Sequence, residues 1–201
     1  MESYSRPNQG LRQPFNLELS ALLILDMQDY FLDSNSHAFI PSGKIILPGL
    51  LRTAEYFRSM GRPVLGTKHI NTERNAAMMG KWWSELILQS HPLSNLNQKL
   101  EIQMDEVIQK SQYDAFHEST LNEVIKKQGI QQLIIGGVMT HLCCESTARA
   151  AFVRGYEVFF LVDGTATYNR DYHQGTLRNL AHGMAVLTTT DRLISEMGNV
   201  K

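Results

Sequence analysis

The stretch that decides the fold is QLIIGGVMTHLCCESTARAAFVRGYEVFFLV, residues 132–162. Its first part, residues 132–138, is an apolar run typical of a strand buried on both faces of a parallel sheet. Residues 142–154 are rich in alanine and other small residues, and they indicate a helix that Gly155 ends. A second apolar strand is expected at residues 156–162. A strand, a helix and a strand in this order predict a βαβ unit.

The rest of the chain repeats this alternation on both sides of the unit. Further strands are expected at residues 19–25, 63–67, 106–110 and 185–188, and further helices at residues 50–60, 120–127, 172–182 and 191–197. We therefore predict an α/β protein with a single-domain, three-layer Rossmann-like fold: a mostly parallel sheet of about six strands with helices on both faces. Residues 1–17 are polar and are predicted to form an N-terminal arm before a domain that spans residues 18–201.

Composition excludes several classes of function. The 201 residues are 43% hydrophobic and 19% charged, which is the size and balance of one globular domain. Nineteen Lys and Arg against 20 Asp and Glu give a net charge of −1, so neither nucleic acid nor an anionic membrane is an expected partner. The N-terminus lacks the apolar core of a signal peptide, and no apolar run approaches the roughly 20 residues of a membrane-spanning helix.

The two cysteines, Cys143 and Cys144, are neighbours in the sequence. Two adjacent sulfurs cannot join distant parts of a fold, which excludes a disulfide framework. Free thiols are typical of a reducing compartment, so a cytoplasmic location is expected.

Three chemically capable side chains follow predicted strands. Asp26 ends the first strand, Lys110 ends the strand at 106–110, and Cys143 comes shortly after the strand at 132–138. Ligands of open α/β sheets bind outside the carboxyl ends of the strands. A cysteine near a helix N-terminus is favoured as a thiolate, and the same N–H groups could stabilise an oxyanion.

Together these side chains could form a nucleophilic site. Cys143 would attack, Asp26 would move the proton, and Lys110 would stabilise the thiolate and keep the carboxylate ionised. Taken singly, each has an ordinary structural interpretation: a capping carboxylate, a solvated lysine and a small buried cysteine.

Several motifs in the same order resemble the isochorismatase-like cysteine hydrolase superfamily, which includes isochorismatases, nicotinamidases and N-carbamoyl amidohydrolases. They are LLILDMQDYF (22–31), KSQYDAFHES (110–119), GVMTHLCCESTARAAFVRGYEV (137–158) and VDGTATYNRDYHQGTLRNLA (162–181). The resemblance covers about residues 20–196. It implies that the family's catalytic residues fall on Asp26, Lys110 and Cys143. It also implies a cis peptide bond between Val138 and Met139, beside the oxyanion-binding segment, and a homo-oligomer, either a dimer or a tetramer.

The cysteine pair separates branches of the superfamily. Isochorismatases resemble this chain in the same motifs, but they typically carry glycine at the position of Cys143 and cysteine at that of Cys144. They cleave a vinyl ether by acid catalysis from the aspartate and need no thiol. Because Cys143 stands at the nucleophile position, the chain resembles the amidohydrolase branch, and Cys144 is expected to be structural.

The leading prediction is a metal-independent cysteine hydrolase that acts on a small amide, ureido or related C–N substrate through an acyl-thioester on Cys143. One alternative is vinyl-ether hydrolysis with Asp26 as the general acid. Another is a non-catalytic binding or scaffold protein on the same fold.

The expected site lacks the family's metal-binding pattern. Nicotinamidases usually bind a divalent metal through Asp-x-His and a further histidine. The corresponding stretch here is TKHIN (67–71), in which Thr67 replaces the aspartate, and no histidine follows His69 before His91. We therefore expect neither a metal nor another cofactor, which also counts against a nicotinamidase. The candidates for the wall of a mostly apolar substrate pocket are Gln28, Phe31, Trp83, Tyr113, Phe116 and His117.

Overall fold

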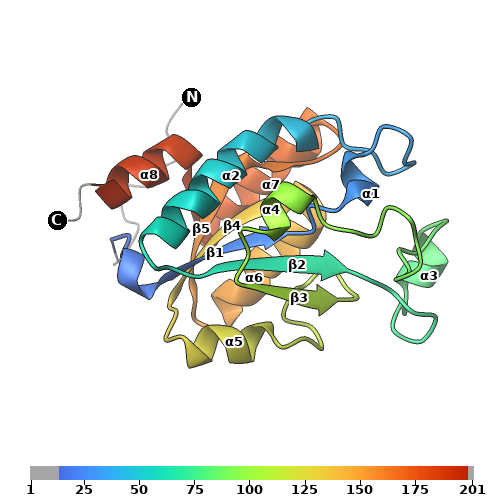
Figure 1. Cartoon of the computed structure of the whole chain (residues 1–201), viewed down its shortest axis with the longest axis horizontal. Helices are drawn as coiled ribbons and strands as arrows, with labels where there is room; N and C mark the ends of the chain where they lie inside the picture. Colours follow the sequence, from blue (N-terminus) through green and yellow to red (C-terminus); the bar gives the residue numbers. More distant parts are fainter. Residues whose placement is uncertain (1–13, 199–201) are drawn as a thin grey trace.

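Within residues 14–198, which are those that the computed structural model describes, one parallel sheet forms the centre of the protein (Figure 1). Its strands are β1 (Ser20–Leu25), β2 (Val64–His69), β3 (Glu106–Lys110), β4 (Gln132–Val138), β5 (Glu157–Ala166) and β6 (Ala185–Thr188). Their order is β3-β2-β1-β4-β5-β6, and every neighbouring pair is parallel. The predicted α/β class and about six strands are confirmed, and the sheet is parallel throughout rather than mostly so.

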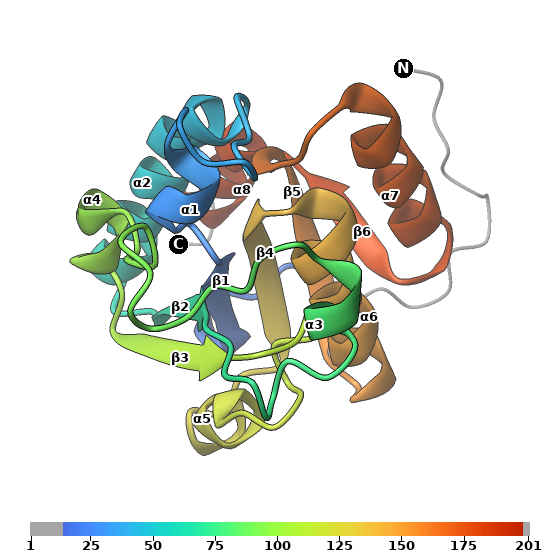
Figure 2. The same ribbon diagram turned by 90° about the vertical axis from the view of Figure 1, so that its right-hand side faces the viewer.

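Helices cover both faces of the sheet, as predicted. The first face carries α2 (Gly43–Ser59), α4 (Gln98–Glu101) and α8 (Thr190–Gly198), and the second carries α5 (Leu121–Lys127), α6 (Glu145–Val153) and α7 (Arg170–Gly183). The short helices α1 (Asp29–Leu32) and α3 (Met79–Trp82) lie at the carboxyl ends of the strands, which face the viewer in Figure 2. No helix of the described residues has the length and apolarity needed to cross a membrane.

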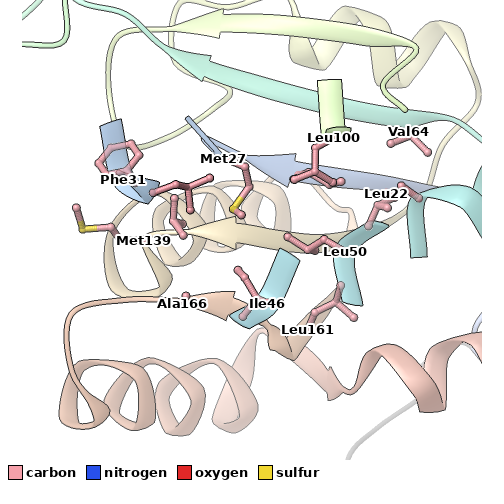
Figure 3. Close-up of a cluster of buried hydrophobic side chains, with 14 of the residues drawn as sticks. Leu22, Met27, Phe31, Ile46, Leu50, Val64, Leu100, Met139, Leu161 and Ala166 are labelled. Carbon is pink, nitrogen blue, oxygen red and sulfur yellow. The ribbon is translucent and has the colours of Figure 1, made fainter. Parts of the chain in front are cut away.

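The apolar core lies in two layers because successive residues of a strand point to opposite faces. In β1, Leu22 and Ile24 belong to the cluster under α2, in which Figure 3 shows Leu22 near Leu50, whereas Leu23 and Leu25 belong to the cluster on the other face. All six residues of β1 are buried. This two-sided burial explains the unbroken apolar runs that predicted the strands.

The chain order of the strands places a crevice at the centre of the sheet. From the centre of the sheet, successive strands are added toward one edge in the order β1, β2, β3. They are added toward the other edge in the order β4, β5, β6. The loops that leave β1 and β4 therefore diverge to opposite faces, and ligands of open α/β sheets bind at such a switch point. Asp26 follows β1, and Cys143 follows β4.

The structure differs from the sequence-based expectations at several boundaries. Helix α2 begins at Gly43 and includes Pro48, so it starts about two turns before the predicted 50–60. The segment expected as one helix at 142–154 is divided into a π-helix, η2 (Thr140–Cys144), and α6. Of the predicted arm, residues 1–13 lie outside the described residues, and residue 17 begins the short 3-10 helix η1 (Leu17–Leu19).

Candidate active site

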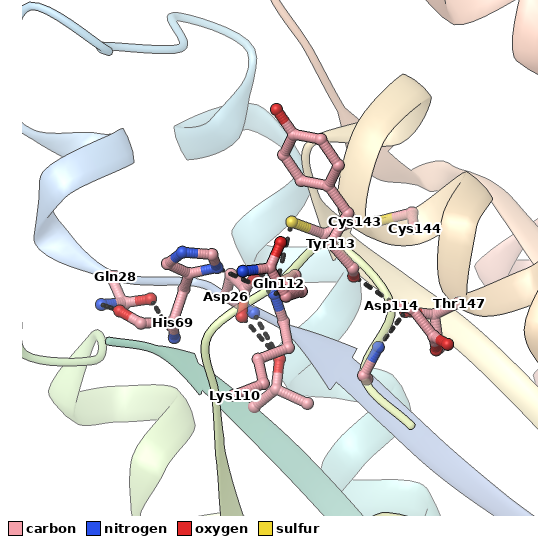
Figure 4. A network of polar contacts seen from close by, with 12 residues as sticks. Asp26, Gln28, His69, Lys110, Gln112, Tyr113, Asp114, Cys143, Cys144 and Thr147 are labelled. Atoms are coloured by element: carbon pink, nitrogen blue, oxygen red, sulfur yellow. Dashed lines mark hydrogen bonds and ion pairs between the residues drawn. The ribbon is translucent and has the colours of Figure 1, made fainter. Parts of the chain in front are cut away.

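The three predicted catalytic residues come together at the switch point (Figure 4). The Nζ atom of Lys110 lies 2.7 Å from Oδ2 of Asp26 and 3.4 Å from Sγ of Cys143. It also donates to the backbone carbonyl of Gln112 at 2.9 Å. Lys110 is 2% exposed and Asp26 is fully buried, so this ion pair is shielded from water.

Strand register explains how Lys110 reaches the other two residues. Lys110 ends β3, two strands away from β1, and its register partner on β2 is His69. Its long side chain therefore passes His69 to reach Asp26. Nδ1 of His69 lies 3.1 Å from Nζ of Lys110, which makes His69 a further member of the site. The sequence left His69 open as a metal ligand, an ordinary polar side chain or a pocket residue, and the β2–β3 register is the signal that could have revealed its contact with Lys110.

Thr67 on β2 fixes the Asp26 carboxylate, and Gln28, which directly precedes α1, fixes the end of β2. The hydroxyl of Thr67 donates to Oδ1 of Asp26 at 2.6 Å. Gln28 accepts from the backbone N–H of His69 at 2.8 Å and donates to the carbonyls of His69 and Ser94 at 3.1 and 2.8 Å. Gln28, predicted as a pocket wall, is thus buried behind the site, where its amide holds β2 in place.

The charges of the buried group follow from its contacts. Burial alone would raise the pKa of Asp26, but the ammonium of Lys110, together with smaller effects of His69 and the Thr67 hydroxyl, more than offsets it, and the pKa of Asp26 lies below its ordinary value. Burial alone would likewise lower the pKa of Lys110, but Asp26 and Cys143 hold that pKa above its usual range. Both groups are therefore charged at neutral pH.

The ionisation of Cys143 differs from the sequence-based expectation. Burial raises the pKa of the Cys143 thiol to about 12, and the Lys110 ammonium only partly opposes the burial and the nearby Asp26 carboxylate. Cys143 does lie in the first turn of a helical segment, because η2 begins at Thr140 and continues directly into α6, but burial has the larger effect on the pKa of its thiol. The resting group is consequently a thiol beside an ionised carboxylate.

The neighbouring Cys144 lies away from this site. It is fully buried, and it packs in the hydrophobic cluster between α6 and the sheet. The peptide bond between Val138 and Met139 is cis, as the resemblance implied.

A cavity of about 550 Å³, counted to its open mouth, leads to Cys143 from the carboxyl ends of the strands. Its lining is mostly apolar and aromatic: Tyr30, Phe31, His37, Ala38, His69, Asn71, Met79, Trp83, Glu85, Leu86, Ile87, Tyr113, Met139, Leu142, Cys143 and Tyr168. The predicted wall residues Phe31, Trp83 and Tyr113 are among them, and the indole N–H of Trp83 donates to the Tyr113 hydroxyl at 2.8 Å.

Two other predicted wall residues lie outside this lining. Phe116 is buried on the α5 and α6 side of the sheet, where it stacks on Tyr156 with the ring centroids 5.9 Å apart. His117 is exposed beside Glu118. Both follow the loop that carries Tyr113, and that loop has turned away from the cavity before it reaches them.

The donor atoms of the site do not fit a divalent metal. A carboxylate oxygen of Asp26, a ring nitrogen of His69 and Sγ of Cys143 lie within 4.8 Å of one another. Nζ of Lys110 lies within 3.4 Å of all three residues, so a metal ion bound to them would lie against an ammonium. Thr67 stands at the position of the metal-binding aspartate of nicotinamidases, and its hydroxyl donates a hydrogen bond to Asp26.

The structure thus combines a parallel α/β sheet with a buried group of Asp26, Lys110 and Cys143 at its switch point. The isochorismatase domain model matches residues 20–192, so the chain belongs to the isochorismatase family and is a hydrolase.

Its relatives agree with this assignment. The chain is 37% identical over 196 residues to Nicotinamidase 3 of Arabidopsis thaliana, with 95% of each chain covered. It is 29% identical over 196 residues to Enterobactin synthase component B of Escherichia coli K12, covering 96% of this chain and 68% of that one. A crystal structure of a cysteine hydrolase from Pseudomonas syringae pv. phaseolicola 1448A has the same fold, with a TM-score of 0.88, 22% identity, and 98% and 100% coverage.

Proposed function

We propose that this hydrolase cleaves a small, uncharged carboxamide or ureido compound, with Cys143 as the nucleophile and without a metal. The observation that carries the proposal is the position of Cys143, which lines the cavity on one side and lies 3.4 Å from Nζ of Lys110 on the other. A buried thiol that is in reach of both a substrate and an ionised carboxylate is arranged for nucleophilic catalysis.

The proposed reaction moves one proton through Asp26. The carboxylate accepts the thiol proton as Sγ of Cys143 attacks the carbonyl carbon. The protonated Asp26 then donates to the leaving nitrogen as the C–N bond breaks, which leaves an acyl-thioester. Asp26 then deprotonates a water molecule, which attacks the thioester. The acid is released, and Asp26 returns the proton to the sulfur. Lys110 keeps its charge throughout and stabilises the sulfur and the carboxylate whenever they are anionic.

The cavity lining supports an uncharged substrate. Among the described residues that line it there is no arginine or lysine, and the carboxylate of Glu85 stands at its wall. A dianion such as isochorismate would find no cationic partner there and would meet a negative charge. The similarity to Nicotinamidase 3 makes nicotinamide the first amide to test, although the sequence pattern counted against a metal-dependent nicotinamidase.

Matched cysteine variants test the proposal. Cys143→Ala is expected to abolish the release of ammonia from any amide that the wild type hydrolyses, because the nucleophile is lost. Cys144→Ala removes the same atoms one residue away and is expected to keep most of the activity, because that thiol only packs in the core. The measurement is ammonia release over a panel of nicotinamide, other aromatic amides and ureido compounds. Loss of turnover in Cys144→Ala, with Cys143→Ala active, would overturn the assignment.

The alternative of vinyl-ether hydrolysis has its own test. The motif 26–31, DMQDYF, favours it, and Asp26 would be the general acid. With isochorismate as the substrate, Asp26→Asn would then remove all activity, and Cys143→Ala would be tolerated. Severe loss of amide hydrolysis in both variants supports the amidohydrolase.

A cytoplasmic location and a homo-oligomer stay predictions for this protein.

A further inference from the structure

A chain of hydrogen bonds ends on the catalytic lysine. Nδ2 of Asn71 donates to the backbone carbonyl of Ser111 at 2.9 Å, so the amide oxygen of Asn71 faces the other way, toward Nε2 of His69 at 3.0 Å. An amide oxygen can only accept, and Nε2 of His69 must therefore carry the hydrogen. The other ring nitrogen, Nδ1, is left with its lone pair, and it faces Nζ of Lys110 at 3.1 Å.

The surroundings of His69 agree with a neutral ring that carries its hydrogen on Nε2. The ring is buried, and burial, with a smaller effect from Lys110, lowers the pKa of His69 to about 4. The ring is thus neutral at neutral pH, which is the form that can accept from an ammonium. Among the described residues, the Asp26 carboxylate and the hydrogen bond with Asn71 favour a protonated ring, and burial together with Lys110 outweighs them.

The ammonium has as many short contacts as it has protons. Nζ of Lys110 lies 2.7 Å from Oδ2 of Asp26, 2.9 Å from the carbonyl of Gln112 and 3.1 Å from Nδ1 of His69. These three acceptors would use all three of its hydrogens, so Sγ of Cys143, to which Nζ also donates, has to share one of them. The contact with Sγ of Cys143 is the longest, at 3.4 Å. Lys110 is accordingly held as a fixed charge near the sulfur, while proton exchange is left to Asp26.

We propose that His69 and Asn71 are positioning residues, which hold the Lys110 ammonium beside Asp26 and Cys143 through a neutral imidazole that accepts at Nδ1. The inference rests on the catalytic roles given above to Lys110 and Cys143. It assigns to His69, at the position of a metal-binding histidine in related nicotinamidases, a role that coordination of a metal at Nδ1 would prevent.

Two substitutions of His69 separate the effect of its hydrogen-bond acceptor from the effect of its side-chain size. His69→Asn can place its amide oxygen close to where Nδ1 lies and keeps an acceptor for Lys110. His69→Leu fills similar space without one. In His69→Leu the third ammonium proton is free to turn to the sulfur, which favours the thiolate. We therefore expect Cys143 alkylation by iodoacetamide at pH 8 to become at least about tenfold faster, which is a fall of one unit in the thiol pKa. Turnover of an amide is expected to fall about 10- to 100-fold with little change in KM.

In His69→Asn both rates are expected to stay within about fivefold of the wild type, since one neutral acceptor replaces another. Cys144 is an internal control: because it is fully buried one residue away, its alkylation would report a general loosening of the site. Alkylation of both cysteines in His69→Leu, or equal behaviour of the Leu and Asn variants, would overturn the proposal.

Asn71→Asp tests the tautomer by a pH profile. The aspartate still accepts from Nε2, but its charge favours the doubly protonated ring, which has no acceptor at Nδ1. Turnover in Asn71→Asp is expected to fall as the pH is lowered from 8 to 6 and to recover at higher pH, whereas the wild type shows no such step. A metal content near one per chain, with activity lost to a chelator and restored by that metal, would contradict the proposal. Because alkylation needs no substrate, it still tests His69 if Cys143→Ala shows that the proposed amide hydrolysis is wrong.

Discussion

At the scale of single residues, Asp26 and Lys110 act on Cys143 in opposite directions. The carboxylate raises the pKa of the thiol and the ammonium lowers it, while burial sets the direction of the whole shift. This arrangement suits a thiol that gives up its proton only during attack, because the base that accepts it is already ionised. A permanently formed thiolate, as in cysteine sites governed by a helix N-terminus, is not needed here.

The opposed charges predict an unusual phenotype for Asp26→Asn. Removing the carboxylate takes away an effect that raises the Cys143 pKa and leaves the ammonium, so the thiol should titrate at lower pH. We expect faster alkylation of Cys143 at pH 8 than in the wild type, together with a loss of turnover of about 10²- to 10⁴-fold, because no group can protonate the leaving nitrogen. Mass spectrometry of iodoacetamide adducts and an ammonia assay measure the two effects. Slower alkylation in the variant would contradict this account of the charges.

The residues that sequence reasoning could place are those whose position depends on strand ends. Asp26, Lys110 and Cys143 follow strands of a parallel sheet, and all such ends lie at one edge. The contact of His69 with Lys110 depends on the register between β2 and β3, which a periodic pattern does not specify. Phe116 was wrongly assigned to the pocket because aromatic residues suit a pocket and a core equally well.

At the scale of elements, the approach of β4 to β1 positions Cys143 relative to Asp26. Gly137 has a φ of 110°, and a Cβ at this residue would lie 2.1 Å from the backbone oxygen of Leu25. Leu25 directly precedes Asp26, and Gly137 directly precedes the segment that leads to Cys143. The absence of a side chain at Gly137 therefore lets the two loops that carry Asp26 and Cys143 start from adjacent points.

We predict that Gly137→Ala destabilises the protein and lowers its activity. The new methyl group would push β4 away from β1 and would also strain a backbone that favours glycine. A loss of roughly 3 kcal/mol or more in the free energy of unfolding is expected, measured by urea denaturation. Gly155→Ala is the matched control: its φ of 88° is also positive, but no atom lies within 4 Å of the added Cβ. It should cost only about 1–2 kcal/mol. Equal losses would show that packing against Leu25 does not matter.

A second element-scale feature is the segment between β2 and β3, which contributes Trp83, Glu85 and other residues to the cavity wall. Contacts of Glu85 join this segment to α1 and to the loop that follows α1. The hydroxyl of Tyr30 donates to Glu85 at 2.8 Å, Nδ1 of His37 lies 3.0 Å from the carboxylate, and Nε2 of His91 lies 3.5 Å away. One carboxylate thus joins three parts of the chain at the mouth of the cavity.

Glu85→Ala is expected to loosen this wall without unfolding the protein. Amide hydrogen exchange in residues 71–96 should become faster, and KM for an amide should rise, while the melting temperature changes little because the side chain is partly exposed. Glu73→Ala, on the exposed part of the same segment, is the control and should change neither quantity. Unchanged exchange in Glu85→Ala would show that the three contacts do not hold the segment.

The sequence predicts the boundaries of those elements whose signal lies in a few neighbouring residues. The strands at 106–110, 132–138 and 185–188 match β3, β4 and β6, because apolar runs between turn residues are local signals. The start of α2 was missed because proline usually occupies the first turn of a helix, whereas Pro48 lies one turn further in. The π-helix at η2 depends on packing around the site, for which no sequence period exists.

At the scale of the whole molecule, a buried ion pair lies at the point where the sheet reverses its strand order. Asp26 has a lowered pKa and Lys110 a raised one. The stabilisation from Asp26 is present above the unfolded pKa of about 3.9 and is lost as the pH falls through the folded value. That from Lys110 is present below the unfolded pKa of about 10.4 and is lost as the pH rises through the folded value. The pair therefore contributes fully between roughly pH 4 and pH 10.

Substitution of one or both partners distinguishes function from stability. Lys110→Met leaves the Asp26 carboxylate buried without its partner and should cost about 3–5 kcal/mol in the free energy of unfolding. In the double variant Asp26→Asn/Lys110→Met no buried charge remains, and we expect a smaller loss than in Lys110→Met alone. Asparagine suits the positive φ of 51° at residue 26.

The surface variant Lys127→Met is the control, and its free energy of unfolding should stay within about 0.5 kcal/mol of the wild type. Urea denaturation at pH 7 measures these three and the single variant Asp26→Asn. A double variant that is stable but inactive would show that the pair is kept for catalysis rather than for folding, and a double loss equal to the sum of the single losses would contradict the coupling.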